Sequence, residues 1–172
     1  MNRTLRQRAP FSAQATQGGF TLLEVLIAIV VLSIGLLGLA GLQAAGLRNN
    51  QGAYLRTIAT QQAYDMADRI RANPLGAGTT AGSYDNISGT GSDPGCIASG
   101  CTPVAMAQYD AYEWNTANQD LLPAGQGTVK RTAANRFTIT VMWDDARTGA
   151  AGVECGSDPK VDLTCFSVSL QP

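Results

Sequence analysis

An apolar run from Phe20 to Leu47 constrains this chain more than any other feature of its sequence. Glu24 is the only charged residue in the run. A transmembrane helix needs about 20 apolar residues, so the run is long enough to cross a bilayer. The leader before it carries Arg3, Arg6 and Arg8, which the positive-inside rule places in the cytoplasm. In a bacterium this predicts a single pass through the inner membrane, with the C-terminal part in the periplasm.

Two small residues, Gly18 and Gly19, lie between the basic leader and the apolar run. A secretory signal has its small-residue cleavage site on the far side of the apolar region. A cut after Gly19 would instead leave the apolar segment attached to the product. The alternative is an ordinary signal anchor in which the glycine pair occurs by chance.

The composition argues against an enzyme and against a nucleic-acid-binding protein. The 172 residues include no His, which is the commonest general base and the commonest metal ligand. We therefore expect no catalytic residues, no metal and no cofactor. Removal of residues 1–19 leaves 9 basic against 13 acidic residues, a net charge of −4. Nucleic-acid binding would require a basic patch or stripe, which this balance does not favour.

An amphipathic pattern continues the helix beyond Leu47. Apolar residues recur at helical spacing, while charged residues fall between them. The apolar set is Leu55, Ile58 or Ala59, Gln62 or Ala63, Met66 and Ile70. We expect Met66 and Ile70 to lie beneath a sheet. The charged residues expected on the solvent or partner face are Asp65, Asp68, Arg69 and Arg71. Because Pro74 disfavours helical geometry in the preceding residue, the helix should end near Asn73.

The segment after this helix begins with a region of low information. Residues 74–103 are rich in Gly, Ser, Thr and Pro without hydrophobic periodicity, which predicts a long surface loop. Residues 85–89 contain an N-x-S sequon and part of a calcium-loop pattern, but neither continues into a full motif. Residues 104–122 predict a short helix, because Ala107, Ala111 and Trp114 share a face and Pro123 provides a stop.

Alternating residues predict strands in the last third of the chain. Residues 136–143 alternate apolar and polar side chains, residues 166–170 repeat the pattern, and residues 127–131 precede both. An antiparallel sheet laid on the amphipathic half of the helix would bury both apolar faces. The predicted fold class is α+β, with a long N-terminal helix packed on a small antiparallel sheet. The expected segments are a leader at 1–19, a transmembrane half at 20–47, an amphipathic half at 48–73 and a globular domain at 74–172.

Asp144 and Asp145 are adjacent acids that could be taken for a catalytic or metal-binding pair. Consecutive strand residues point to opposite faces, so these carboxylates do not converge on a strand. A solvated turn is the preferred interpretation.

The string Gly19-Phe20-Thr21-Leu22-Leu23-Glu24, followed by VLIAIVVL, resembles the leader junction of type IV pilins and type II secretion pseudopilins. The resemblance implies that a prepilin peptidase cleaves between Gly19 and Phe20 and methylates the new amine of Phe20. It also implies that Glu24 attracts the positive N-terminal amine of a neighbouring subunit during assembly. Thr21 and Glu24 also match a capping box, so a local role for Glu24 stays open.

Four further strings are together similar to PilV-type minor pilins. They are GLLGLAGLQAAGLRNN, residues 64–74, residues 121–123 and residues 139–143. The resemblance implies a non-enzymatic subunit that joins other minor pilins and the major pilin at the inner-membrane assembly platform. Such a subunit primes the pilus tip complex and helps present a tip adhesin at the cell surface, with roles in adhesion and twitching motility. The alternatives are a type II secretion minor pseudopilin and, in another class, a membrane-anchored ligand- or DNA-binding pilin module.

Small residues recur along the apolar helix at Gly35, Gly38, Gly41 and Ala45. They predict a stripe where another helix backbone could approach closely. The alternative is that glycine is simply frequent in transmembrane helices.

Four cysteines follow the membrane segment, on the oxidising side where disulfides persist. They are Cys96, Cys101, Cys155 and Cys165, and the sequence alone permits three pairings. A zinc site would need close cysteine pairs at both ends. The pilin resemblance favours the two local pairings, because many pilins close a C-terminal loop between their last strands with a disulfide.

Overall fold

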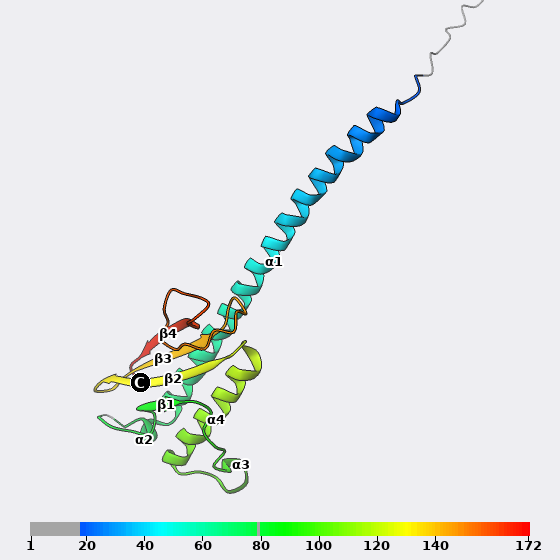
Figure 1. Ribbon diagram of the computed structural model, residues 1–172. Coiled ribbons are helices and arrows are strands. Elements are labelled where there is room, and N and C mark those ends of the chain that lie inside the picture. The colour runs from blue at the N-terminus through cyan, green and yellow to red at the C-terminus, as the bar shows by residue number, and fades with distance from the viewer. Residues whose placement is uncertain (1–17, 79) are drawn as a thin grey trace, which may run out of the picture. The chain divides into compact units, whose positions relative to one another are not determined.

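The computed structural model describes residues 18–78 and 80–172, so the leader predicted at 1–19 lies outside the described residues up to position 17. The chain divides into two compact units, Met1–Ala45 and Gly46–Pro172. Helix α1 (Leu22–Ala72) contributes residues to both units (Figure 1). Its end agrees with the predicted stop near Asn73.

A short helix, α2 (Pro74–Ala77), follows α1 after one intervening residue. Pro74 occupies the first turn of α2, where its missing amide hydrogen costs no helical hydrogen bond. The Asn73 side chain accepts a hydrogen bond from the Gly76 amide at 3.0 Å and so caps this helix. The proline therefore ends one helix and begins the next.

The sheet of the second unit has four antiparallel strands in the order β1-β2-β3-β4 (Figure 1). They are β1 (Asn86–Ser88), β2 (Gln126–Ala133), β3 (Arg136–Trp143) and β4 (Thr164–Leu170). The register pairs Val129 with Ile139 and Ile139 with Val168, which places these three side chains on one face. The long helix and the antiparallel sheet confirm the predicted α+β class.

The core of the second unit lies between that face of the sheet and two helices, the second half of α1 and α4 (Pro103–Leu121). Met66 and Ile70 are fully buried, as the amphipathic pattern predicts. Trp114 of α4 is also fully buried, and its indole donates to the Gln62 carbonyl of α1 at 2.8 Å. Gly127 of β2 allows this packing, because a Cβ there would collide with the Trp114 ring. Each such large apolar side chain contributes about 1.5–3 kcal/mol on burial.

The prediction that residues 74–103 form only a surface loop is wrong. The segment contains α2, β1 and another short helix, α3 (Cys96–Ser99). It also buries Ala77, Tyr84 and Ile87 in the core. A strand of three residues is too short to show an alternating pattern, and the burial of Tyr84 depends on a hydroxyl partner that comes from α4.

The prediction of a solvated turn at residues 144–145 is half right. The residues do form a turn after β3, but Asp144 is buried, with 6% of its surface exposed. Its carboxylate accepts from the amide of Gly149 at 2.8 Å and from that of Thr148 at 3.1 Å. Burial opposes the charge of Asp144, but these amides outweigh it, so the pKa of the carboxyl lies below its ordinary value.

Candidate assembly site

The residues at the predicted cleavage point lie directly before α1. Gly18, Gly19 and Phe20 are exposed and precede the first helical turn. The Thr21 hydroxyl accepts from the Glu24 amide at 3.2 Å and so acts as the N-cap of α1. Among the residues that the structure describes, no side-chain hydrogen bond or ion pair is formed by the Glu24 carboxylate. The helix start is therefore capped by Thr21, and the charge of Glu24 has no described partner.

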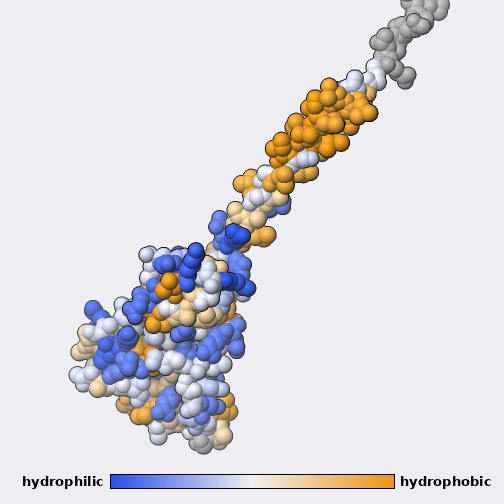
Figure 2. All heavy atoms as spheres, in the orientation of Figure 1, coloured by the Kyte–Doolittle hydropathy of each residue, from blue (hydrophilic) through white to orange (hydrophobic). Residues whose placement is uncertain are grey.

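The part of α1 in the first unit exposes its apolar side chains on every face. The exposed fraction is 84% for Phe20 and Leu22, and it stays near or above one half for the large side chains that follow up to Leu42. By its length and apolar composition, this helix could cross a membrane. An N-terminal signal sequence meets the same two criteria. Figure 2 shows the almost unbroken hydrophobic surface of this part of the helix. Such a surface requires lipid or a protein partner.

The glycines at positions 35, 38 and 41 face open space. A Cβ built at any of them would meet nothing within 4 Å. The backbone of α1 is therefore accessible to another helix at these positions, as close helix packing requires.

A polar cluster joins α1 to α4 in the second unit. The Arg69 guanidinium donates to Asp65 at 2.8 Å, to Asp110 at 3.2 Å and to Glu113 at 3.0 Å. The Tyr84 hydroxyl donates to the other carboxylate oxygen of Asp110. The charged residues of this helix were expected to lie mostly on the solvent or partner face; Asp65, Asp68 and Arg71 are exposed, and Arg69 is the exception with a side chain only 27% exposed. The reason is that α4 brings two acids against it.

Four groups of this cluster have shifted pKa values. Burial lowers the pKa of Arg69, but the surrounding carboxylates outweigh it and raise the pKa above its ordinary value. The pKa of Tyr84 is raised by burial and by its hydrogen bond to Asp110. Tyr109 donates to Glu113 at 2.6 Å, which raises the pKa of Tyr109 to about 12. Bonds from Tyr109 and Arg69 lower the pKa of Glu113. The hydrogen bonds and ion pairs of the cluster therefore hold the two helices together.

The structure brings the four cysteines together as two local disulfides, Cys96–Cys101 and Cys155–Cys165. The first joins the first residue of α3 to the connection before α4, and the second joins the connection before β4 to β4 itself. Within residues 18–78 and 80–172, no group of three His, Cys, Asp or Glu side chains is arranged to hold a metal ion.

The sequence interpretation did not identify Tyr84, Asp110 and Glu113 as partners of Arg69. The two acids lie three residues apart on a helix that was predicted, so they share a face. An arginine at 69 among acids was the available signal, but nothing in the sequence indicates which helix it meets.

Two family models match the chain. The Prokaryotic N-terminal methylation motif matches residues 14–40, which include the junction at Gly19 and Phe20 and the acid at Glu24. The model described as Type IV pilin Tt1218 matches residues 41–112, from the middle of α1 to the middle of α4. No curated protein and no solved structure matches the chain significantly.

The first match places the N-methylation motif of prokaryotic prepilins at the start of α1. The second half of this long helix packs on a small antiparallel sheet. The motif and the fold together are those of the prepilin class of proteins. The second match narrows this class, because it places a type IV pilin domain directly after the motif. Together the two matches support a pilin-type structural subunit that carries a prepilin N-methylation motif followed by a type IV pilin domain.

Proposed function

We propose that this chain is a PilV-type minor pilin that joins the tip complex of a type IV pilus, primes pilus assembly and helps present a tip adhesin. Residues 1–19 are a leader that prepilin peptidase removes, and Phe20 becomes the methylated N-terminus. Residues 20–47 hold the chain in the inner membrane before assembly. Residues 48–73 and the domain at 74–172 lie in the periplasm and later at the pilus tip.

The proposal depends most on the placement of Glu24 in an exposed apolar helix. A charge in such a segment is costly in a membrane unless another group neutralises it. The Thr21 hydroxyl caps the Glu24 amide, whereas the Glu24 carboxylate forms no capping hydrogen bond among the described residues. A positive N-terminal amine on a neighbouring subunit would provide the missing partner, and the attraction would be strong in a low dielectric.

The variant Glu24→Gln tests this role, because it removes the charge and keeps the size of the side chain. We expect it to be cleaved and inserted normally but recovered poorly with minor-pilin partners and in sheared pili. The matched control is Thr21→Ala, which removes the cap and keeps the charge. Normal incorporation of Glu24→Gln together with poor incorporation of Thr21→Ala would reduce the role of this region to helix capping.

A minor pseudopilin of type II secretion is the runner-up, because the leader junction is shared between the two systems. The partners distinguish them. Co-purification of the tagged chain from membranes should recover minor pilins and pilus components if the first proposal is right. Recovery of secretion pseudopilins would favour the second, as would secretin and general secretion genes beside its own gene.

A DNA-binding pilin module is less well supported. The cations beyond Arg71 are Lys130, Arg131, Arg136, Arg147 and Lys160. Arg131 donates to Asp85 at 2.7 Å and lies 4.3 Å from the ring centre of Phe137, so it is engaged within the fold. Phosphate contacts dominate affinity for DNA, and the remaining charges are few. Salt-sensitive retardation of DNA by the purified chain would revive this function.

A further inference from the structure

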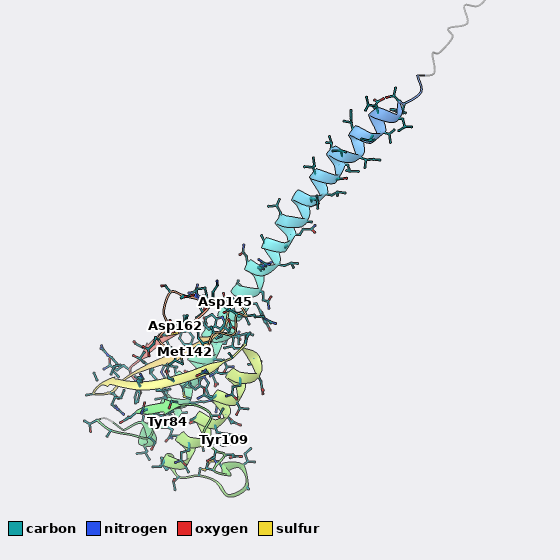
Figure 3. The ribbon with its side chains drawn as sticks, in the orientation of Figure 1. Tyr84, Tyr109, Met142, Asp145 and Asp162 are labelled. Carbon is teal, nitrogen blue, oxygen red and sulfur yellow. A yellow bond between two sulfur atoms is a disulfide. The ribbon has the colours of Figure 1, made fainter. Side chains whose placement is uncertain are left out.

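A groove in the second unit lies between the first turns of its part of α1 and the connection that follows β3. Its lining is Arg48, Asn49 and Gln51 on one side and Asp145, Ala146 and Arg147 on the other, around a volume of about 590 Å³. Figure 3 shows Asp145 beside α1. The carboxylate oxygens of Asp145 lie 3.5 Å from the position that a Cβ on Gly52 would occupy, so the two walls are in close contact at this point.

The loop wall of the groove is held in a defined conformation. Asp144 accepts from the amides of Thr148 and Gly149, and its carbonyl accepts from the Arg147 amide at 3.3 Å. Arg147 has a φ of 53°, in the left-handed region that a side chain of this kind rarely adopts. The Asp145 carboxylate accepts from the Trp143 indole at 3.0 Å. This wall therefore presents the Arg147 side chain from a loop fixed at both ends.

The guanidinium groups of the two arginines in the groove are available to a ligand. Arg48 and Arg147 are exposed, and neither guanidinium forms a side-chain hydrogen bond or ion pair within the described part of the chain. Arg48 directly follows Leu47, the last residue of the apolar run. Asp145, the acid of the groove, is engaged by Trp143. Two arginines and one aspartate line the groove, so the net charge of its lining is +1.

We propose that this groove binds the headgroup of an anionic phospholipid in the periplasmic leaflet of the inner membrane. Guanidinium groups bind phosphate through paired hydrogen bonds, and the amides of Asn49 and Gln51 provide donors and acceptors for glycerol hydroxyls. The position of Arg48, one residue beyond the apolar run, is the depth at which basic side chains meet headgroups. The inference rests on the membrane insertion proposed above. Beyond insertion, the inference adds a defined contact with one lipid headgroup, which the subunit must release when it leaves the membrane.

The test titrates the full chain, purified in a neutral detergent, with dioleoyl phosphatidylglycerol and follows bound lipid by native mass spectrometry. We expect one phosphatidylglycerol to bind in preference to phosphatidylethanolamine. Inorganic phosphate at millimolar concentration should not displace it. Equal binding of both lipids would overturn the proposal, and displacement by inorganic phosphate would show a free-phosphate site instead of a lipid site.

Variants locate the binding. Arg48→Gln and Arg147→Gln should each weaken phosphatidylglycerol binding about tenfold, since each removes charge-assisted hydrogen bonds. Asp145→Asn should strengthen it, because a negative charge leaves the groove while the amide oxygen can still accept from Trp143. The matched control is Arg56→Gln, an exposed arginine further along α1 that does not line the groove. An equal loss with Arg56→Gln would contradict a defined groove and indicate general attraction to the membrane.

The outcome for membrane insertion is read separately. Before detergent is added, the membranes that contain the chain are extracted with alkaline carbonate, which strips peripheral proteins from membranes. A chain that stays in the membrane but shows no lipid preference refutes this inference alone. A chain that is stripped from the membrane refutes the insertion on which the proposed function depends.

Discussion

Asp144 is the side chain on which the conformation of the turn after β3 depends. It is buried, and its two carboxylate oxygens accept from consecutive backbone amides at Thr148 and Gly149. A carboxylate can accept at both oxygens, whereas an amide side chain can accept at only one. The turn therefore requires an acid at this position.

Asp144→Asn should lower the free energy of unfolding by about 1–3 kcal/mol at pH 7, because an amide NH₂ would face a backbone N–H. The folded pKa of Asp144 lies below its unfolded value of about 3.9. The stabilisation is therefore fully present above about pH 5 and is lost as the pH falls through the lower, folded pKa. Denaturant unfolding of the wild type and the variant at pH 7 and between pH 5 and 3 measures this difference.

The matched control for this prediction is Asp145→Asn, which changes the adjacent, exposed acid. It should leave stability almost unchanged. Equal stability of Asp144→Asn and wild type at pH 7 would contradict the account of the turn.

Burial of single polar residues was the least predictable feature at this scale. Arg69 contacts Asp110 and Glu113, which lie 41 and 44 positions later in the chain. No local sequence pattern indicates such a contact. Arg69 was therefore predicted, with its charged neighbours, on the solvent or partner face. Met66 and Ile70 could be predicted because their burial follows from helical periodicity alone.

At the scale of elements, α1 serves two environments with one continuous helix. Its residues in the first unit expose apolar side chains, whereas those in the second unit bury a narrow stripe against the sheet and α4. Leu55, Ala63 and Met66 belong to that stripe. The second half of α1 therefore lines one side of the core.

Met66→Asp should unfold the second unit, because Met66 is fully buried and an unpaired carboxylate would enter the core. Circular dichroism and thermal melting of the full chain in detergent measure the loss. Gln61→Asp, at an exposed position of the same helix, is the control and should melt like wild type. A stable Met66→Asp variant would mean that another face of α1 packs on the sheet.

Reduction of the two disulfides should lower the melting temperature of the same domain. By the chain-entropy model, loops closed by Cys96–Cys101 and Cys155–Cys165 contribute roughly 2–3 kcal/mol each. Melting with and without reductant gives the shift, and the paired variant Cys155→Ser with Cys165→Ser isolates the second loop. An unchanged midpoint would mean that neither loop constrains the unfolded chain.

Elements with a clear periodicity of apolar residues could be predicted from the sequence, whereas short elements without such periodicity could not. β3 could be recognised because Phe137, Ile139, Val141 and Trp143 alternate over a full strand, and all four are buried. β1 spans three residues, too few to show an alternating pattern, and it pairs with β2, which begins 38 residues after β1 ends. Such a pairing between distant segments has no local signal in the sequence.

At the scale of the whole molecule, the chain combines an exposed apolar helix with a folded, disulfide-bonded domain. The apolar helix exposes its side chains and the backbone at its glycines, so a partner could contact both. The folded domain buries two apolar clusters among its described residues. A subunit held first by lipid and then by other subunits has this division of surfaces.

The central claim is that the chain is processed between Gly19 and Phe20 and then assembled into a filament. It is tested most directly by mass spectrometry of the N-terminal peptide of the chain recovered from sheared filaments. We predict a mature protein that begins at Phe20, carries one methyl group on its amine and is present in the filament fraction. A chain that is found only in membranes, or that starts at any residue other than Phe20, would contradict the account.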